Sequence, residues 1–143
     1  MGLPQGSPLS PILYLFFNAN LVERQITRER GAVAFIDDYT AWVTGKSADQ
    51  NTEAIQNTII LEALAWAAAS GAIFEVKKTT FIHFTRSIPK RSGRKLQVGD
   101  QLIVPEKQVK ILGVIMDENL RFHTHVARAV DRGLRAANAL RRL

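Results

Sequence analysis

The amino-acid sequence predicts an α+β fold, because its expected elements follow the order helix, hairpin, helix, strands, helix. Three observations carry this prediction. A helical apolar run lies near the start, a pair of acidic residues interrupts two strand-forming runs, and an amphipathic basic helix ends the chain. A length of 143 residues suits one domain or a piece of a larger one.

The first predicted helix runs from Ser10 to about Gln25. Residues 2–11 hold three prolines and two glycines, so they favour a turn over a regular helix. Ser10 can cap a helix with its hydroxyl, and Pro11 fits the first helical position. Because the first half of this helix is nearly all apolar, we expect it to be largely buried.

The next predicted element is a hairpin that carries Asp37 and Asp38 at its turn. Residues 32–36 and 39–43 are rich in β-branched and aromatic side chains, which favours two strands around the acidic pair. Two interpretations of the pair stay open at this point. Adjacent carboxylates repel each other, and a divalent cation relieves that repulsion. Aspartate is equally a common turn residue.

The middle of the chain predicts a second helix from Asp49 to Ser70, with Gly71 as its C-terminal stop. Residues 87–94 predict a loop, and Gly99-Asp100 predicts the turn of a short hairpin. The strand-like segments are residues 72–76, 80–84, 95–98, 101–104 and 109–116.

The last predicted helix begins at about His123 and is amphipathic. Its apolar face holds Val126, Val130, Leu134, Ala137 and Leu140. Its opposite face holds Arg128, Arg132, Arg135 and Arg142. Such a stripe can lie along a phosphate backbone, or it can simply be the solvated side of a helix. The sequence pattern leaves both interpretations open.

Charge is distributed unevenly along the chain, although the net charge is +6. Residues 1–85 contain six Lys and Arg against eight Asp and Glu, whereas residues 86–143 contain thirteen against five. A basic half joined to a half with paired carboxylates favours a polyanion partner and a cation-dependent centre. The chain has no cysteine and no apolar run near the roughly 20 residues of a membrane span, so we expect no thiolate site and no membrane partner.

Four segments together resemble the conserved motifs of reverse transcriptases. The segment GLPQGSPLSPIL is similar to motif B, and FIDDYTAWVTG is similar to motif C. KKTTFIHF resembles motif D, and VKILGVIMDENLRFHTHV resembles motif E with its following residues. The details are most similar to the enzymes of non-LTR (LINE-type) retrotransposons. The PQGSPLSP turn speaks against a viral RNA-dependent RNA polymerase, which also has an Asp pair on a hairpin.

This resemblance implies a partial polymerase palm, an antiparallel hairpin sheet packed on helices, in residues 1–118. Residues 119–143 would begin a basic, helical thumb. Asp37 would be the metal-binding carboxylate of the palm, with Asp38 as ligand or support, and the cofactor would be Mg²⁺ or Mn²⁺. The partners implied are an RNA template, a DNA primer and a dNTP, together with other parts of a parent polyprotein. The resemblance is compatible with a nuclear location, which the residues themselves leave open.

The resemblance also implies roles for residues outside the acidic pair. Gln5, Gly6 and Ser7 of motif B would lie beside the incoming nucleotide and template. Lys78 would neutralise the leaving phosphate or act as a general acid; Lys77 is its neighbour, and an exposed lysine is the alternative. Leu112 and Gly113 would form the primer grip, with a buried strand as the alternative. Arg128, Arg132 and Arg135 would follow the product duplex.

The two-metal mechanism also needs a second carboxylate, which the family supplies from motif A, upstream of motif B. None of the remaining acidic residues in the chain is placed to replace it. We therefore expect that these 143 residues alone do not polymerise DNA. Two functions remain: a fragment of an RNA-directed DNA polymerase that acts in a longer polypeptide, or a non-catalytic remnant that binds nucleic acid.

Overall fold

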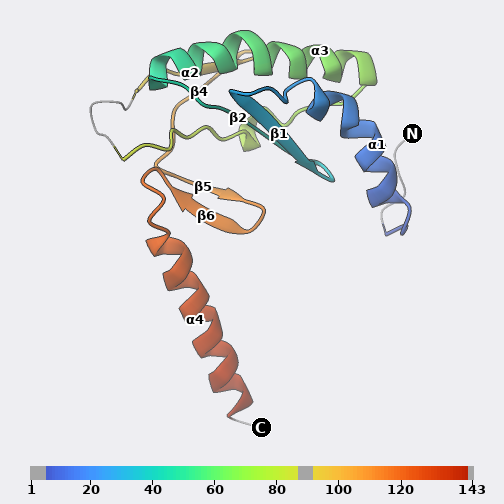
Figure 1. The fold of residues 1–143 in the computed structure, drawn as a ribbon. Coiled ribbons are helices and arrows are strands. Elements are labelled where there is room, and N and C mark those ends of the chain that lie inside the picture. Colours follow the sequence, from blue (N-terminus) through green and yellow to red (C-terminus); the bar gives the residue numbers. More distant parts are fainter. Residues whose placement is uncertain (1–5, 87–91, 142–143) are drawn as a thin grey trace.

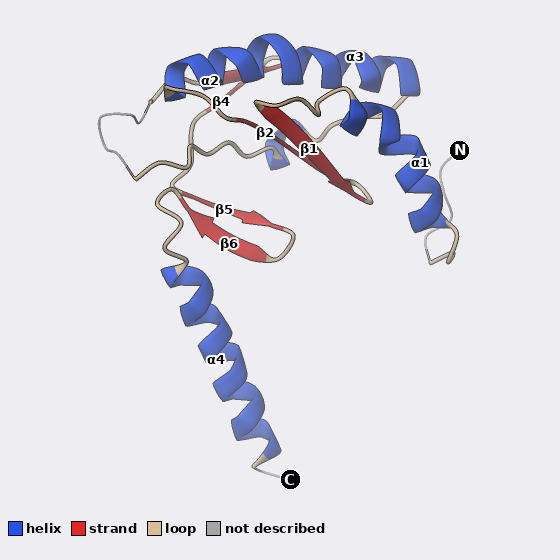
Figure 2. Cartoon of the chain, in the orientation of Figure 1, coloured by secondary structure: helices blue, strands red, loops and turns tan. Residues whose placement is uncertain are grey.

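The structure is a computed structural model that describes residues 6–86 and 92–141. It is a mixture of helices and strands, as the sequence predicts (Figures 1 and 2). The helices are α1 (Ser10–Glu23), α2 (Ala48–Ala54), α3 (Leu61–Ser70) and α4 (His123–Leu140), with a π-helix η1 (Ile55–Ile60) and a 3-10 helix η2 (Val76–Lys78). The strands are β1 (Arg30–Phe35), β2 (Asp38–Val43), β3 (Leu96–Val98), β4 (Gln101–Ile103), β5 (Gln108–Ile111) and β6 (Val114–Asp117).

The strands form three separate two-stranded antiparallel sheets within the described residues: β1–β2, β3–β4 and β5–β6. The two predicted hairpins, β1–β2 and β3–β4, are therefore confirmed, but the described hairpins do not join into one sheet. The helices α2, η1 and α3 follow one another as a single long rod over the β1–β2 hairpin, and α1 lies beside that hairpin (Figure 1). Helix α4 extends away from the rest of the chain (Figure 1). None of the helices within residues 6–86 and 92–141 has the length and apolar character to cross a membrane.

Two small hydrophobic clusters lie against the long helical rod. The first joins α1 to α3 through Leu21, Ala63, Trp66 and Ala67. The second joins η1 to the β3–β4 hairpin through Ile60, Phe81, Leu96 and Val98. The aromatic ring of Trp66 also meets Phe17 and Phe74, at ring-centroid distances of 5.0 and 6.1 Å. The core is thus divided, and Trp66 is the largest side chain in the first cluster.

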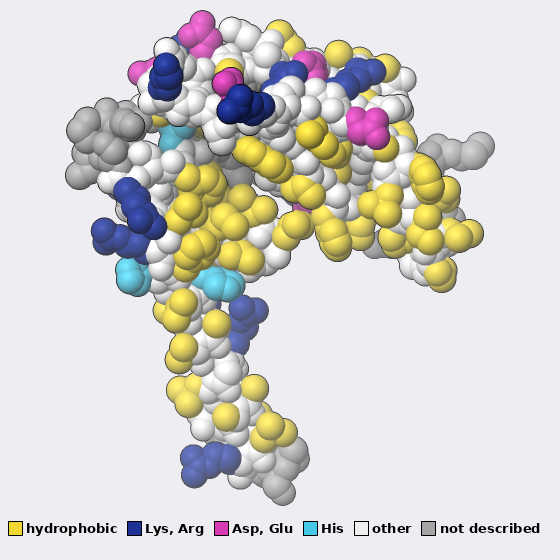
Figure 3. Space-filling model, viewed as in Figure 1, with side chains coloured by type: hydrophobic (Ala, Val, Ile, Leu, Met, Phe, Trp, Pro, Cys, Tyr) yellow, Lys and Arg dark blue, Asp and Glu magenta, His cyan; other side chains and the backbone are white. Residues whose placement is uncertain are grey.

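Helix α1 differs from its prediction in both its start and its burial. Leu9 is the N-cap residue, without a side-chain cap, and Ser10 already lies within the helix. Only Asn18 and Leu21 are buried on α1, whereas Phe16 is 75% exposed. Figure 3 shows hydrophobic side chains covering much of the helix in this view. The prediction of a largely buried helix is wrong, because the elements of this chain cover only one side of α1.

The second predicted helix is confirmed, with one irregularity and a different cap. Ser47, not Asp49, is the N-cap residue, and its side chain accepts a hydrogen bond from the Gln50 backbone N–H. The middle of the rod is the π-helix η1. Gly71 ends α3 with φ 71°, the left-handed conformation that favours glycine at this position.

Two predicted strands, residues 72–76 and 80–84, are wrong. Residues 72–75 have no regular structure and lead into η2, and Ile82 forms only an isolated bridge to Glu106. Their side chains favour extended backbone, but a strand also needs a neighbour that pairs along its length. Among the described residues, the bridge between Ile82 and Glu106 is the one β-pairing that these two segments make.

Of the strand predictions for the two later hairpins, one is confirmed and the other is wrong. The short hairpin around Gly99-Asp100 is confirmed, with Val98 paired to Gln101. The single strand predicted over residues 109–116 is instead the β5–β6 hairpin, in which Ile111 pairs with Val114. Its turn residues, Leu112 and Gly113, have φ angles of 45° and 88°. Two positive φ values in a two-residue turn match the right-handed twist of the flanking strands.

A half-buried tyrosine beneath the rod links stability to pH. The hydroxyl of Tyr39 is buried without a hydrogen-bond partner. Burial and then the Glu62 carboxylate raise the pKa of Tyr39 to about 12, against the opposite effect of Arg30. The folded state therefore holds the phenol proton more tightly than the unfolded state, whose pKa is 10.0.

We predict that the protonated Tyr39 makes its full contribution to the free energy of unfolding below pH 10, and that this contribution is lost as pH rises to about 12. Tyr39→Phe should reduce this alkaline loss and change the free energy of unfolding at neutral pH by no more than about 1 kcal/mol, because the hydroxyl makes no bond there. Urea unfolding of both proteins across this pH range measures the difference. Equal alkaline losses in the two proteins would contradict the prediction.

The connection between β6 and α4 is organised by one carboxylate. Asp117 Oδ1 accepts hydrogen bonds from the backbone N–H groups of Asn119 and Arg121, and Oδ2 accepts from those of Arg121 and Phe122 at 2.9 and 2.6 Å. Desolvation raises the pKa of Asp117, but these backbone hydrogen bonds together lower it below its usual value of 3.8. Leu120 and Phe122 adopt positive φ in this connection, a conformation that leucine and phenylalanine disfavour. The hydrogen bonds to the Asp117 carboxylate therefore stabilise an unfavourable backbone conformation.

We predict that Asp117→Ala loosens α4 from the β5–β6 hairpin without unfolding the core clusters. Hydrogen exchange should accelerate at Arg121, Phe122 and the first turn of α4, while the amides of α3 keep their protection. The unchanged chain should lose the same protection only as pH falls through the lowered pKa of Asp117, because an ionised carboxylate is the better acceptor. Unaltered exchange at Phe122 in Asp117→Ala would refute this.

Candidate functional site

The β1–β2 hairpin presents both candidate metal ligands at its exposed tip. Its register ends with Phe35 paired to Asp38, so the two-residue turn is Ile36-Asp37. The sequence prediction of a turn at Asp37-Asp38 is thus wrong by one residue: Asp38 is the first residue of β2. Both carboxylates are exposed. Water and an incoming cation can therefore reach them.

The turn itself has a conformation that its sequence does not predict. Ile36 has φ 55°, in the left-handed region that a β-branched side chain strongly disfavours. Its carbonyl oxygen accepts a hydrogen bond from the side-chain amide of Asn18 on α1, at 2.6 Å. Asn18 is buried, with 9% of its surface exposed. Sequence reasoning missed Asn18; the one available signal was a polar residue within the most apolar stretch of the chain.

The motif B residues lie at the start of α1, at the opposite end of that helix from its core contacts. Gly6 has φ 88°, and a Cβ atom there would meet no other atom within 4 Å. The Ser7 hydroxyl accepts a hydrogen bond from the Leu9 backbone N–H at 3.3 Å. Gln5 lies outside the described residues. The backbone of this turn is therefore open for close approach by a ligand.

Lys78 and the β5–β6 turn are two further predicted positions. Lys78 ends the 3-10 helix η2, its backbone N–H bonds the Glu75 carbonyl at 3.0 Å, and its side chain is exposed. Leu112 and Gly113 form the exposed tip of the β5–β6 hairpin. Each position is accessible to a ligand, and each lies on a different element from the acidic hairpin tip. Their roles remain predictions.

The arginine face of α4 is exposed, as expected for either interpretation of it. Arg128, Arg132 and Arg135 are all exposed, and Arg135 forms an ion pair with Asp131 one turn earlier. The apolar face is exposed too, since Val130 and Leu134 are 64% and 60% accessible. Two side-chain contacts tie α4 to its neighbouring hairpin: Gln108 donates to the Thr124 hydroxyl, and the Ile115 backbone N–H donates to His125 Nδ1.

The acidic tip fits a divalent cation in chemistry but is short of ligands. Carboxylate oxygens are the donors that Mg²⁺ prefers, and Asp37 and Asp38 supply them. Within residues 6–86 and 92–141, no group of three His, Cys, Asp or Glu side chains is placed to hold a metal ion. The hairpin therefore offers part of a metal site.

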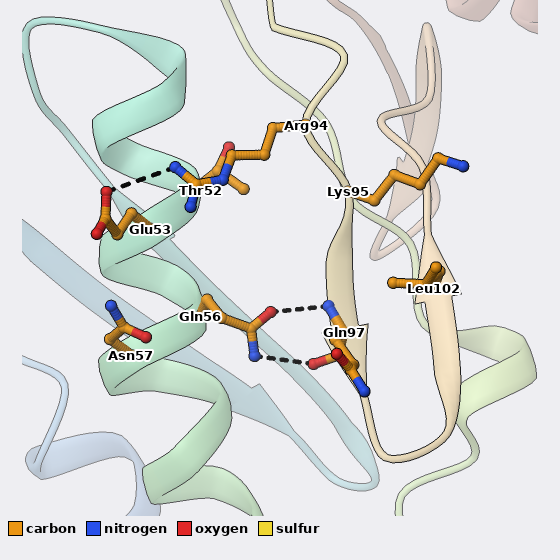
Figure 4. A pocket seen from close by; sticks show the side chains of 8 residues that line it. All are labelled: Thr52, Glu53, Gln56, Asn57, Arg94, Lys95, Gln97 and Leu102. Atoms are coloured by element: carbon orange, nitrogen blue, oxygen red, sulfur yellow. Dashed lines mark hydrogen bonds and ion pairs between the residues drawn. The ribbon is translucent and has the colours of Figure 1, made fainter.

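A separate cavity of about 270 Å³ lies between the helical rod and the β3–β4 hairpin (Figure 4). Gln56 bonds the Gln97 backbone on both sides, donating to its carbonyl at 3.0 Å and accepting from its N–H at 2.7 Å. Glu53 pairs with Arg94 at 3.4 Å. Two pairs of lining residues, Glu53 with Arg94 and Gln56 with Gln97, thus bond each other across the cavity, which contains none of the predicted site residues.

Comparison with known proteins identifies the family. Residues 1–116 match the family described as reverse transcriptase (RNA-dependent DNA polymerase). The chain therefore belongs to the reverse transcriptase family, as its motifs predict. Across 131 residues it is 29% identical to the RNA-directed DNA polymerase from mobile element jockey of Drosophila funebris. That alignment covers 87% of this chain but 14% of the relative, so the chain spans a small part of that protein. No solved structure matches this chain significantly.

Proposed function

We propose that this chain is part of the reverse transcriptase of a non-LTR retrotransposon, in which residues 1–118 belong to the palm and residues 119–143 begin the thumb. The observation that carries the proposal is the acidic tip of the β1–β2 hairpin, inside the segment that matches the family. The similarity to the jockey polymerase supports a mobile-element origin. The reaction is RNA-templated extension of a DNA primer.

In this reaction the primer 3′-hydroxyl attacks the α-phosphorus of a dNTP, and pyrophosphate leaves as the new P–O bond forms. Mg²⁺ or Mn²⁺ at the acidic tip would activate the hydroxyl and stabilise the leaving group. Asp37, at the exposed turn, would hold the cation through its carboxylate, and Asp38 would support it from the first position of β2. A further carboxylate comes from motif A in the longer polypeptide.

The remaining predicted residues have supporting roles in this proposal. Gln5, Gly6 and Ser7 form the wall beside the nucleotide and template, where Gly6 leaves room for a base or sugar. Lys78 neutralises the leaving pyrophosphate or donates a proton to it. Leu112 and Gly113 contact the primer end. Arg128, Arg132 and Arg135 contact phosphates of the product duplex, which the exposure of their face allows.

A non-catalytic nucleic-acid-binding remnant is the second candidate. The observation that favours it is the combination of an exposed arginine face with an incomplete ligand set among the described residues. Both functions include binding to a primer–template duplex. They differ in whether a polypeptide with a motif A carboxylate incorporates nucleotides.

Primer extension separates the two functions. A polypeptide that contains this segment and motif A is incubated with an RNA template, an annealed DNA primer, dNTPs and Mg²⁺, and the 143-residue chain is tested in parallel. We expect extension by the longer polypeptide only, and salt-dependent duplex binding by both. Binding without extension in either protein would favour the remnant. Extension by the 143-residue chain would refute the need for a further carboxylate.

A further inference from the structure

The side chain of Asn18 on helix α1 contacts the acidic hairpin tip. Asn18 and Leu21 are the two buried residues of α1. Leu21 packs in the first core cluster, where its burial needs no polar partner. Burial of the Asn18 amide is unfavourable unless it is hydrogen-bonded, and it donates to the Ile36 carbonyl at 2.6 Å. The one buried polar residue of α1 is thus hydrogen-bonded to the turn that contains Asp37.

The turn needs such a partner. Ile36 is a β-branched residue with φ 55°, a conformation in which its side chain crowds its own backbone. Glycine or asparagine would be the favoured residue at a position of this kind. The last cross-strand pair of the hairpin is Phe35 with Asp38. The hydrogen bond from Asn18 is thus a contact to the Ile36 peptide group from outside the hairpin.

We infer that Asn18 is a positioning residue for the acidic tip: its amide holds the Ile36 peptide in the left-handed conformation, and that conformation sets the direction of the Asp37 carboxylate. The Ile36 peptide group directly precedes Asp37, so a change in its orientation redirects the Asp37 side chain. The functional part of this inference rests on the proposed function, because the direction of the Asp37 carboxylate matters only if it binds a cation. The conformational part stands on geometry alone.

The test uses Asn18→Leu in the 143-residue chain. Leucine has the same number of side-chain heavy atoms as asparagine but no donor, so it removes the hydrogen bond without leaving a cavity. Asn20→Leu is the matched control, since Asn20 is an exposed asparagine on the same helix. NMR reports the Ile36 conformation through its intraresidue amide-to-Hα NOE, which is strong at positive φ. Broadening of the Asp37 and Asp38 amides by Mn²⁺ reports cation binding.

We expect a strong Ile36 NOE in the unchanged chain and in Asn20→Leu, and a weak one in Asn18→Leu. The Mn²⁺ concentration needed for broadening should rise by about tenfold or more in Asn18→Leu, as for other residues that orient a metal ligand. Ile36→Gly added to Asn18→Leu should restore most of the Mn²⁺ response, because glycine adopts positive φ without a partner.

Three results would overturn the inference: a weak Ile36 NOE in the unchanged chain, a strong NOE in Asn18→Leu, or a changed turn with unchanged Mn²⁺ broadening. If Asn18→Leu does not fold, slow exchange of the Asn18 side-chain amide protons in the unchanged chain decides whether the bond exists. Absence of Mn²⁺ broadening in the unchanged chain would instead contradict the metal assignment of the proposed function. In that case the NOE comparison, which uses no metal, still decides the inference.

Discussion

Asp37→Asn should reduce nucleotide incorporation by about 10³-fold or more in a polypeptide that carries this segment together with motif A. Metal-held charge stabilisation contributes several kcal/mol to a phosphoryl-transfer barrier, and each 1.36 kcal/mol is a factor of about ten in rate. Asparagine keeps the size of the side chain but removes its negative charge. Single-turnover incorporation of one dNTP on a primer with an RNA template measures the effect.

Asp100→Asn is the matched control for this loss. Asp100 is also an exposed aspartate in the two-residue turn of a hairpin, β3–β4. Its replacement should leave the incorporation rate within about twofold, because no site residue lies in that turn. Binding of the primer–template duplex should be similar in the unchanged polypeptide, in Asp37→Asn and in Asp100→Asn. A fall of equal size in both variants would show that the loss at Asp37 reflects general damage and would contradict its assignment as a metal ligand.

Trp66→Ala should destabilise the chain by about 3–5 kcal/mol, the usual cost of removing a buried tryptophan from a core. Trp66 is 9% exposed and packs in the first cluster against Leu21, Ala63 and Ala67. Its ring also contacts Phe17 at 5.0 Å between centroids, so α1 loses an aromatic contact as well. Since small domains have about 5–15 kcal/mol of total stability, this one change removes a large share.

Trp42→Ala provides the control with the same substitution on the hairpin. Trp42 is 47% exposed and lies across from Gly31 in the cross-strand register. We expect a cost of about 1 kcal/mol or less, the usual worth of an exposed cross-strand pair. Denaturant unfolding followed by circular dichroism gives both free energies. Equal costs at Trp42 and Trp66 would contradict the assignment of the first cluster as the core that holds α1.

Sequence reasoning predicted the elements whose signals are local. Gly71 marks the end of α3, Gly99-Asp100 marks the β3–β4 turn, and the 3.6-residue period of α4 is plain in its apolar and arginine faces. Each of these depends on residues within a few positions of one another. Family membership was likewise predictable, because motif B is a contiguous pattern.

The failures occur where distant residues decide the structure. Residues 72–76 have strand-forming side chains, but no partner strand among the described residues lies beside them. The burial of α1 depends on which elements cover it, which its own periodicity does not specify. The turn at Ile36 is the clearest case, because no local rule places a β-branched residue at positive φ. The side chain that bonds its carbonyl, Asn18, lies on another element.

The division of the strands into three separate hairpins has a consequence for how fast the chain folds. Each hairpin joins strands that are adjacent in sequence, so its pairing closes only a short loop. Hairpins of this kind form in about 1–10 μs, and low sequence separation between contacts favours rapid folding. The slow events are then the docking of α1 and of the β3–β4 hairpin onto the helical rod, which join residues far apart in the chain. During synthesis on the ribosome, the β1–β2 hairpin can therefore form before α4 has left the exit tunnel.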